Sequence, residues 1–246
     1  MNKWPAYLAF VVAILWHVPA RAQKTVTLAT LDWPPYIGEE LPEKGYVAQI
    51  AVKAFERAGY SVKIDFLPWN RAVDDTWHGS YDAYFPEYYS EEVQRRFFYS
   101  EPFPGGPVGF FKLKTTRLQF ESLEDLKPYT IGVVRGYINS AEFDAANFLH
   151  KDVADNDLSN LKKLLLGRID LAVIDKYVGF YLIKQNFPDK VGELEFLDPP
   201  LNVQDLYLCF PKNSDKSAEL LKAFNAGLNK LREDHGLDRI ISERGF

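Results

Sequence analysis

The stretch LSNLKKLLLGRIDLAVIDKYVGFYLI, residues 158–183, decides the fold class. It opens with four leucines at helical spacing: Leu158, Leu161, Leu164 and Leu165. Gly167 is typical of the residue that ends a helix, and residues 171–174 form an apolar run that predicts a buried strand. Residues 178–183 predict a further helix. Helix, strand and helix in this order are typical of an α/β protein whose parallel sheet is covered by helices.

The same alternation continues outward from this stretch in both directions. Strands are predicted over residues 25–31, 62–67, 81–85, 107–113, 130–134, 171–174 and 206–210. Helices are predicted over residues 47–58, 70–78, 158–165, 178–183 and 220–231. The alternation pauses twice, near residues 112–122 and 199–205, which indicates a chain that crosses to a second lobe and returns. We therefore expect a discontinuous first lobe, residues 23–112 plus 204–246, and a second lobe, residues 113–203.

The composition excludes several classes of protein. The chain has 246 residues, of which 47% are hydrophobic and 26% are charged, as in a folded globular protein. The formal net charge is −5 with both signs interleaved, so the basic footprint of a nucleic-acid-binding protein is absent. Cys209 is the one cysteine, which excludes an intrachain disulfide and a cysteine-based metal site. We expect no metal, no cofactor and no nucleic-acid partner.

Residues 1–22 are predicted to be a cleaved signal peptide rather than part of the fold. Lys3 supplies a positive charge, residues 6–16 are almost wholly apolar, and Ala20-Arg21-Ala22 matches the pattern that signal peptidase cleaves. The alternative is a membrane anchor, but the apolar run falls short of the ~20 residues that span a bilayer. No cysteine lies near the cleavage point, so we expect an exported protein without a lipid anchor.

Aromatic, acidic and basic residues follow the predicted strands, where ligands bind in open α/β sheets. They are Trp33 and Tyr36, Trp69, Glu87 and Tyr88, Arg135 and Tyr137, and Asp175. Ligand pockets combine aromatic walls with a few polar groups, so five such strand ends together favour a cleft. The alternative interpretation is that the prolines and rings simply close loops over the sheet edge.

The chain resembles the family 3 extracellular solute-binding proteins, the periplasmic receptors of polar amino-acid ABC importers. The resemblance lies in strings that recur in the family's order: WPPY at 33–36, GSYDA at 79–83, FFYSEPF at 97–103, IGVVRG at 131–136 and GRIDLAVID at 167–175. It implies a periplasmic-binding-protein-like type II fold, with two α/β lobes joined by a two-segment hinge. It also implies a monomer in the periplasm that closes on a ligand and delivers it to an ABC permease.

The resemblance implies roles for three residues of the cleft. At the position of Trp33 the family has an aromatic ring that packs on the ligand, and Trp69 takes the place of the opposing wall. Asp175 takes the place of the carboxylate that binds the ligand's α-amine. The alternatives are that the tryptophans pack the lobe surface and that Asp175 forms a salt bridge with Lys176 or another base.

Two positions depart from the family. The arginine that grips the ligand's carboxylate is replaced by Val93, with Arg95 close by as a substitute, and Glu87 stands where many members have a small hydroxyl residue. The cleft is thus predicted to be an acidic, aromatic box for a small polar solute with at least one positive charge. Amino acids, particularly basic ones, remain in this class if Arg95 or Arg71 binds the carboxylate.

Two other functions compete with solute uptake. The same fold hosts a cyclohexadienyl dehydratase, and Glu87 beside an aromatic pocket suits a general acid. However, no histidines pair at metal-helix spacing and no Gly-x-Ser-x-Gly elbow exists, so we expect a binding protein and not an enzyme. The other alternative is a soluble ligand-sensing partner of a membrane receptor.

Overall fold

The computed structural model describes residues 24–118 and 120–242. The predicted signal peptide, residues 1–22, lies outside the described residues. No helix within the described ranges has the length and apolar character needed to cross a bilayer.

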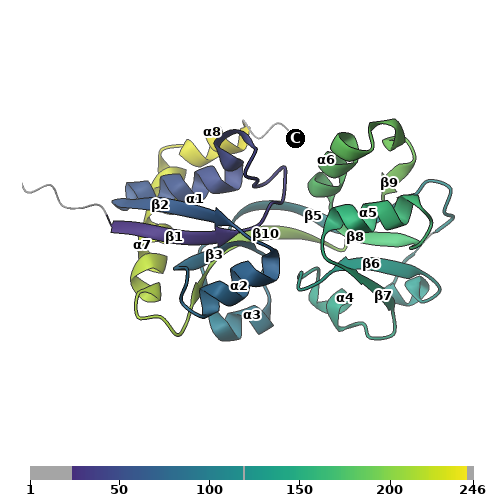
Figure 1. Cartoon of the computed structure of the whole chain (residues 1–246), viewed down its shortest axis with the longest axis horizontal. Helices are drawn as coiled ribbons and strands as arrows, with labels where there is room; N and C mark the ends of the chain where they lie inside the picture. Colours follow the sequence, from purple (N-terminus) through teal and green to yellow (C-terminus); the bar gives the residue numbers. More distant parts are fainter. Residues whose placement is uncertain (1–23, 119, 243–246) are drawn as a thin grey trace, which may run out of the picture.

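The strands join into one ten-stranded sheet with helices packed around it. The order is β2-β1-β3-β10-β5-β8-β6-β7, with β4 paired to β10 and β9 paired to β5. Figure 1 shows the elements gathered into two groups at opposite ends of this sheet, linked by two long strands. We call these groups the first and second lobes. The α/β class predicted from the sequence is confirmed.

The first lobe contains the parallel strands β2, β1 and β3, with β1 in the middle. Its elements are β1 (Lys24–Thr30), η1 (Pro42–Lys44), α1 (Tyr46–Arg57), β2 (Tyr60–Phe66), α2 (Trp69–Trp77), β3 (Ala83–Glu87), α3 (Glu91–Arg96), β4 (Phe97–Tyr99), α7 (Ser217–Glu233) and α8 (Gly236–Ser242). Because β1 and β3 run in the same direction, their carboxyl ends lie at one edge of the sheet and face the second lobe (Figure 1).

The second lobe is built around β6, which pairs in parallel with both β7 and β8. Its elements are η2 (Leu123–Leu126), β6 (Thr130–Val134), α4 (Ala141–Ala145), β7 (His150–Ala154), α5 (Asp157–Leu165), β8 (Leu171–Asp175), α6 (Lys176–Asn186), η3 (Pro188–Lys190) and β9 (Leu194–Phe196). The helices α5 and α6 begin directly after β7 and β8, so their amino ends lie at the carboxyl edge of this sheet.

The strands β5 (Phe103–Leu113) and β10 (Asn202–Pro211) connect the lobes. They pair with each other in antiparallel register, Leu206 with Phe103 and Asn202 with Val108. Beyond that segment β10 pairs with β3 and β4 of the first lobe, and β5 pairs with β8 and β9 of the second. This is the two-strand connection that a hinge requires. The lobe boundaries at residues 112 and 203 stay a prediction.

Close packing of α1 on α7 fixes the core of the first lobe. The apolar face of α1, including Ile50 and Ala54, is fully buried. Phe55 of α1 meets Phe224 of α7 with ring centroids 5.3 Å apart. Any side chain at Gly227 of α7 would collide with the Ala54 carbonyl oxygen, so the helix backbones approach as closely as glycine allows.

Several predicted strands differ at their bounds from the observed ones, and the differences in β3 and β5 bear on the site. Strand β3 covers Ala83–Glu87 instead of 81–85, so Glu87 lies in the last position of the strand and not in the loop after it. Strand β5 begins at Phe103 instead of 107, because Pro104 to Pro107 pair with β10 despite a loop-like sequence. The chain also forms β4, β7 and β9, which the hydrophobic pattern does not indicate.

Candidate functional site

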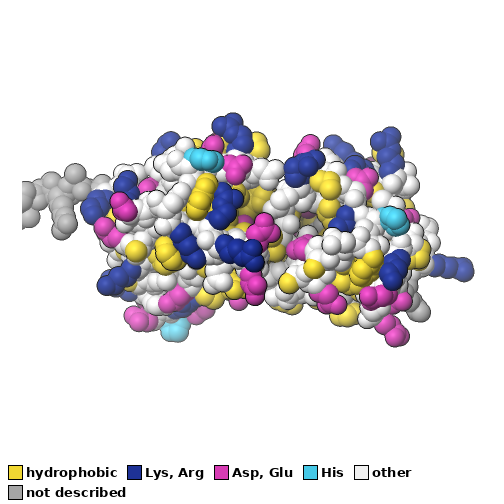
Figure 2. Space-filling view, turned by 90° about the horizontal axis from the view of Figure 1, so that it is seen from below, with side chains coloured by type: hydrophobic (Ala, Val, Ile, Leu, Met, Phe, Trp, Pro, Cys, Tyr) yellow, Lys and Arg dark blue, Asp and Glu magenta, His cyan; other side chains and the backbone are white. Residues whose placement is uncertain are grey.

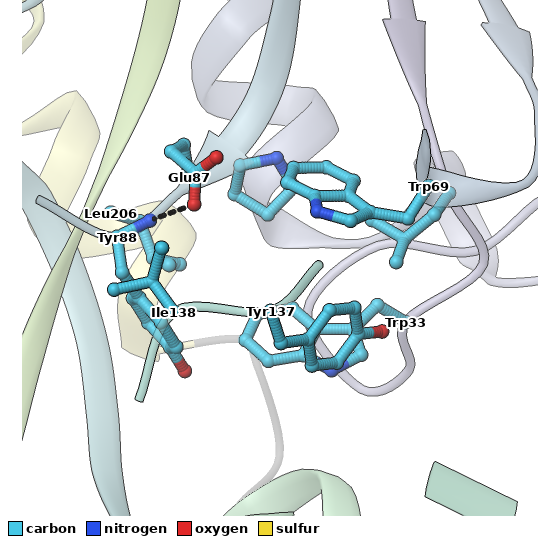
Figure 3. Close-up of a pocket in the computed structure, with 9 residues that line it drawn as sticks. Trp33, Trp69, Glu87, Tyr88, Tyr137, Ile138 and Leu206 are labelled. Carbon is cyan, nitrogen blue, oxygen red and sulfur yellow. Dashed lines mark hydrogen bonds between the residues drawn. The ribbon is translucent and has the colours of Figure 1, made fainter. Parts of the chain in front are cut away.

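A small pocket walled by aromatic rings lies at the junction of the two lobes (Figure 3). It is lined by Leu31, Trp33, Trp69, Pro86, Glu87, Tyr88, Tyr137, Ile138 and Leu206. Most of the first-lobe residues stand at or just beyond the carboxyl ends of β1, β2 and β3, Leu206 lies within β10, and Tyr137 and Ile138 follow β6. Strand polarity therefore brings residues from distant parts of the sequence to one place. Five residues predicted to bind ligand line this cavity: Trp33, Trp69, Glu87, Tyr88 and Tyr137.

The rings of the cavity hold one another in fixed orientations. Trp33 stacks on Tyr36 with ring centroids 4.6 Å apart and meets Tyr88 edge to face at 5.7 Å. Trp69 meets Tyr137 edge to face at 6.2 Å, and its Nε1–H donates to the Gly136 carbonyl across the lobes at 3.3 Å. In Figure 3 the Trp69 ring lies across the cavity from the rings of Trp33 and Tyr137. The walls thus offer the ring faces that attract a cation.

Asp175 occupies the boundary between the lobes. Its Oδ1 accepts hydrogen bonds from the Tyr177 and Val178 backbone at the start of α6. Its Oδ2 accepts from the Tyr36 hydroxyl at 2.8 Å and the Tyr88 hydroxyl at 3.2 Å, both from the first lobe. Burial raises the pKa of Asp175 to about 6, although these hydrogen bonds act in the opposite direction.

The proposed salt bridge between Asp175 and Lys176 is not observed. The Lys176 Nζ lies 3.9 Å from Asp198 and over the Phe196 ring instead. No lysine, arginine or histidine in the described ranges forms an ion pair with Asp175. The carboxylate is held by neutral donors alone, which leaves its charge uncompensated.

Glu87 is a buried carboxyl with two hydrogen-bond donors. The Tyr84 hydroxyl donates to its Oε2 at 3.0 Å and the Tyr88 backbone donates to its Oε1 at 2.9 Å. Burial raises the pKa of Glu87 to about 8, since these two hydrogen bonds only partly offset the loss of hydration. A pKa raised in this way favours the protonated, neutral form of Glu87 at neutral pH.

Asp157 is a buried acid near the cavity that the sequence analysis missed. It is the first residue of α5, three positions after the end of β7, and only 4% of it is exposed. Burial and the nearby charge of Asp175 raise the pKa of Asp157 to about 7. The signal that could have found it is its place after a strand, but HKDVA at 150–154 alternates charged and apolar residues too weakly to predict one.

Three predicted site residues lie elsewhere. Tyr36 is fully buried behind Trp33 and reaches the site through Asp175. Arg95 lies exposed in the last turn of α3, and Arg135 is exposed with its Nε 3.9 Å from Asp155. Neither arginine lines the cavity. Neither of them therefore replaces the carboxylate-binding arginine that the family has and this chain lacks. Val93 lies in a wider groove beyond Trp69.

Charged side chains of both signs are interleaved over the molecular face drawn in Figure 2. That face carries no continuous basic patch. The pattern agrees with the net charge of −5.

Known structures share this fold over nearly the whole chain. A histidine kinase sensor domain similar to periplasmic binding proteins matches with a TM-score of 0.81 at 20% identity, covering 92% of this chain and 98% of that one. An ancestral arginine-binding protein bound to arginine matches with a TM-score of 0.77 at 20% identity, covering 92% and 100%. The Streptococcus pneumoniae protein AbpA, an amino acid ABC transporter substrate-binding protein bound to L-arginine, matches with a TM-score of 0.73 at 16% identity, covering 89% and 94%.

These likenesses establish the fold as that of the type II periplasmic binding proteins, as the resemblance predicted. The neighbours include amino-acid-binding proteins and a sensor domain, which are binding proteins and not enzymes. No family model and no curated protein matches the chain. At such low identity the neighbours describe the architecture alone, and the ligand must be argued from this chain's own residues.

Proposed function

We propose that this protein is a periplasmic receptor that binds a small amine-bearing solute between its lobes and delivers it to an ABC importer. The lobes close around the ligand to bind it. In the open form the ligand contacts one lobe at a time, and in the closed form it contacts both lobes. Trp33, Trp69 and Tyr88 would contact the ligand from the first lobe, and Tyr137 and Asp175 from the second.

The single observation that carries this proposal is the state of Asp175. A buried carboxylate without a cation is costly, and its position beside an aromatic cavity makes a ligand amine the natural partner. The tyrosine hydroxyls of the first lobe reach the same Oδ2 atom, so the group is accessible from both lobes. A bound amine would replace one of these donors and add a full charge.

A thermal-shift screen of amino acids, amines and other small cations tests the proposal, because a ligand that binds only the folded protein raises its melting temperature. Hits should also change tryptophan fluorescence, since Trp33 and Trp69 line the cavity. Asp175→Asn should abolish binding without unfolding the protein, because asparagine caps a helix as well as aspartate does.

The matched control is Asp198→Asn. Asp198 has a side chain that is 75% exposed and lies outside the cavity, so this variant should bind as the wild type does. Full binding by Asp175→Asn, or hits restricted to uncharged solutes, would contradict the proposed role of Asp175.

The likeness to a histidine kinase sensor domain favours a second candidate function, ligand sensing for a membrane receptor. Deleting the gene separates the two. Loss of uptake of the identified ligand supports delivery to an importer, and intact uptake with a lost transcriptional response supports sensing.

A further inference from the structure

The cavity contains no group that could neutralise a ligand carboxylate. None of the described residues that line it is a lysine, arginine or histidine. Arg96, three residues after Val93, stacks over Trp77 with its guanidinium 4.6 Å from the ring centroid. Lys151, in the wider groove, donates to the Phe143 and Asp144 carbonyls. Both cations are engaged away from the cavity.

Acids, by contrast, approach the same site from three elements. Glu87 ends β3, Asp157 begins α5 and Asp175 ends β8. All three are buried, and none forms an ion pair with a described residue. The charges of Asp157 and Asp175 act on each other, and the charge of Asp157 also acts on Tyr88 and Tyr137 of the cavity wall. Two buried acids at one edge favour the binding of a positive charge, and no described residue supplies one through an ion pair.

The Trp33 indole is an independent observation that points to a ligand in this region, because its buried Nε1–H makes no hydrogen bond of normal geometry with a described residue. It interacts with Asp157, so the two groups lie near each other without a well-formed bond. Buried polar groups are normally satisfied, and an orphaned donor beside a buried acid without an ion pair marks a place that a ligand can complete.

We propose that the ligand is an organic cation without a carboxylate group, and that Asp157 joins Asp175 in neutralising it. This inference rests on the proposed function and narrows its ligand class. An α-amino acid would bring its own carboxylate into a cavity lined by Glu87 and by no base, with Asp157 and Asp175 buried close by, and like-charge repulsion opposes that. The decarboxylated amine presents the same cation without that repulsion.

Matched pairs of ligands that differ only in the carboxylate test the inference. Calorimetry of the purified full chain compares arginine with agmatine, lysine with cadaverine, and histidine with histamine. We expect the amine of at least one pair to bind tighter than its amino acid by about tenfold or more. Tighter binding of the amino acid in every pair that binds would overturn the inference and leave the proposed function intact. Absence of binding by all six would contradict both.

The role of Asp157 is tested separately with Asp157→Asn. Its matched control is Asp155→Asn, two residues away, where the side chain is 88% exposed. We expect Asp157→Asn to weaken binding of the preferred amine by about tenfold or more, and the control to leave binding unchanged. The melting temperature of Asp157→Asn should not fall, because the variant removes an uncompensated buried charge. A folded Asp157→Asn that binds the amine as tightly as the wild type overturns the assignment of Asp157.

Discussion

At neutral pH Glu87 is chiefly a neutral hydrogen-bonding group, and Glu87→Gln tests this at the scale of a single residue. The pKa of this acid is raised in the folded protein to about 8, so the unfolded chain ionises first as the pH rises. Stability contributed by this group is therefore lost between about pH 4.5 and pH 8. Glutamine cannot ionise, so the variant should match the wild type near pH 5 and exceed its stability at pH 8.

Urea unfolding of the wild type and Glu87→Gln at both pH values measures this difference. Glutamine can still accept the Tyr88 backbone hydrogen bond and meet the Tyr84 hydroxyl, so the comparison isolates the charge. The opposite result is a variant that loses free energy of unfolding relative to the wild type, with a larger loss at pH 8 than at pH 5. That result would show that Glu87 is ionised and stabilising.

The site could be predicted from the sequence where a residue follows a recognisable strand. Trp33 and Asp175 follow apolar runs that predict strands, and both lie where the parallel sheets place them. Asp157 follows β7, whose five residues are mostly polar, so nothing local marked it. It is buried near Trp33 of the first lobe, and no pattern along one segment contains that information.

At the scale of elements, Gly106 of β5 determines how closely the lobes approach. An alanine Cβ there would lie 2.9 Å from Asp175 Oδ2 and still closer to the Tyr36 hydroxyl. Gly106→Ala should therefore break the hydrogen bond between Tyr36 and Asp175 and lower the free energy of unfolding by about 1–3 kcal/mol. Ligand affinity should fall with it, because the same carboxylate is displaced.

Gly192→Ala is the matched control, since nothing lies within 4 Å of a Cβ at that position. Thermal melts and ligand titrations of both variants measure the effect. If Gly106→Ala binds and melts as Gly192→Ala does, the contact between β5, Tyr36 and Asp175 does not hold the lobes together.

The elements that could be predicted are long or strongly periodic. Helix α1 buries one face of twelve residues, and its apolar spacing is plain in the sequence. Helix α3 has six residues and no buried ones, so it has no apolar stripe to detect. The first half of β5 contains Pro104, Gly105, Gly106 and Pro107, which favour a loop locally. Pairing with β10 overrides that preference, and such pairing is a property of the assembled sheet.

At the scale of the whole molecule, the two crossing strands predict a change of shape on binding. Among the described strands, β5 and β10 alone run from one lobe to the other, so a change in their backbone angles moves one lobe relative to the other. A saturating ligand should reduce the radius of gyration in small-angle X-ray scattering, because contacts from both lobes favour the closed form. Asp175→Asn with the same ligand is the control. An unchanged radius with calorimetrically confirmed binding would exclude hinge closure.

The uncompensated acids also predict that binding a cation releases protons. Near neutral pH the raised pKa values, about 6 for Asp175, about 7 for Asp157 and about 8 for Glu87, leave these groups partly protonated. A cation among them favours the charged forms and lowers each pKa, so protons leave as the ligand enters. The groups that face the acids are tyrosines with raised pKa values, which stay neutral and take up none of these protons.

Calorimetry of the identified ligand at pH 7, in buffers that differ in ionisation enthalpy, measures this exchange. The observed enthalpy should vary with the buffer in the direction of proton release, and Asp157→Asn should reduce the number released because it removes one titrating group. Proton uptake would mean that the bound ligand suppresses ionisation of the acids. A solute that brings its own negative charge into the cavity would act in that way.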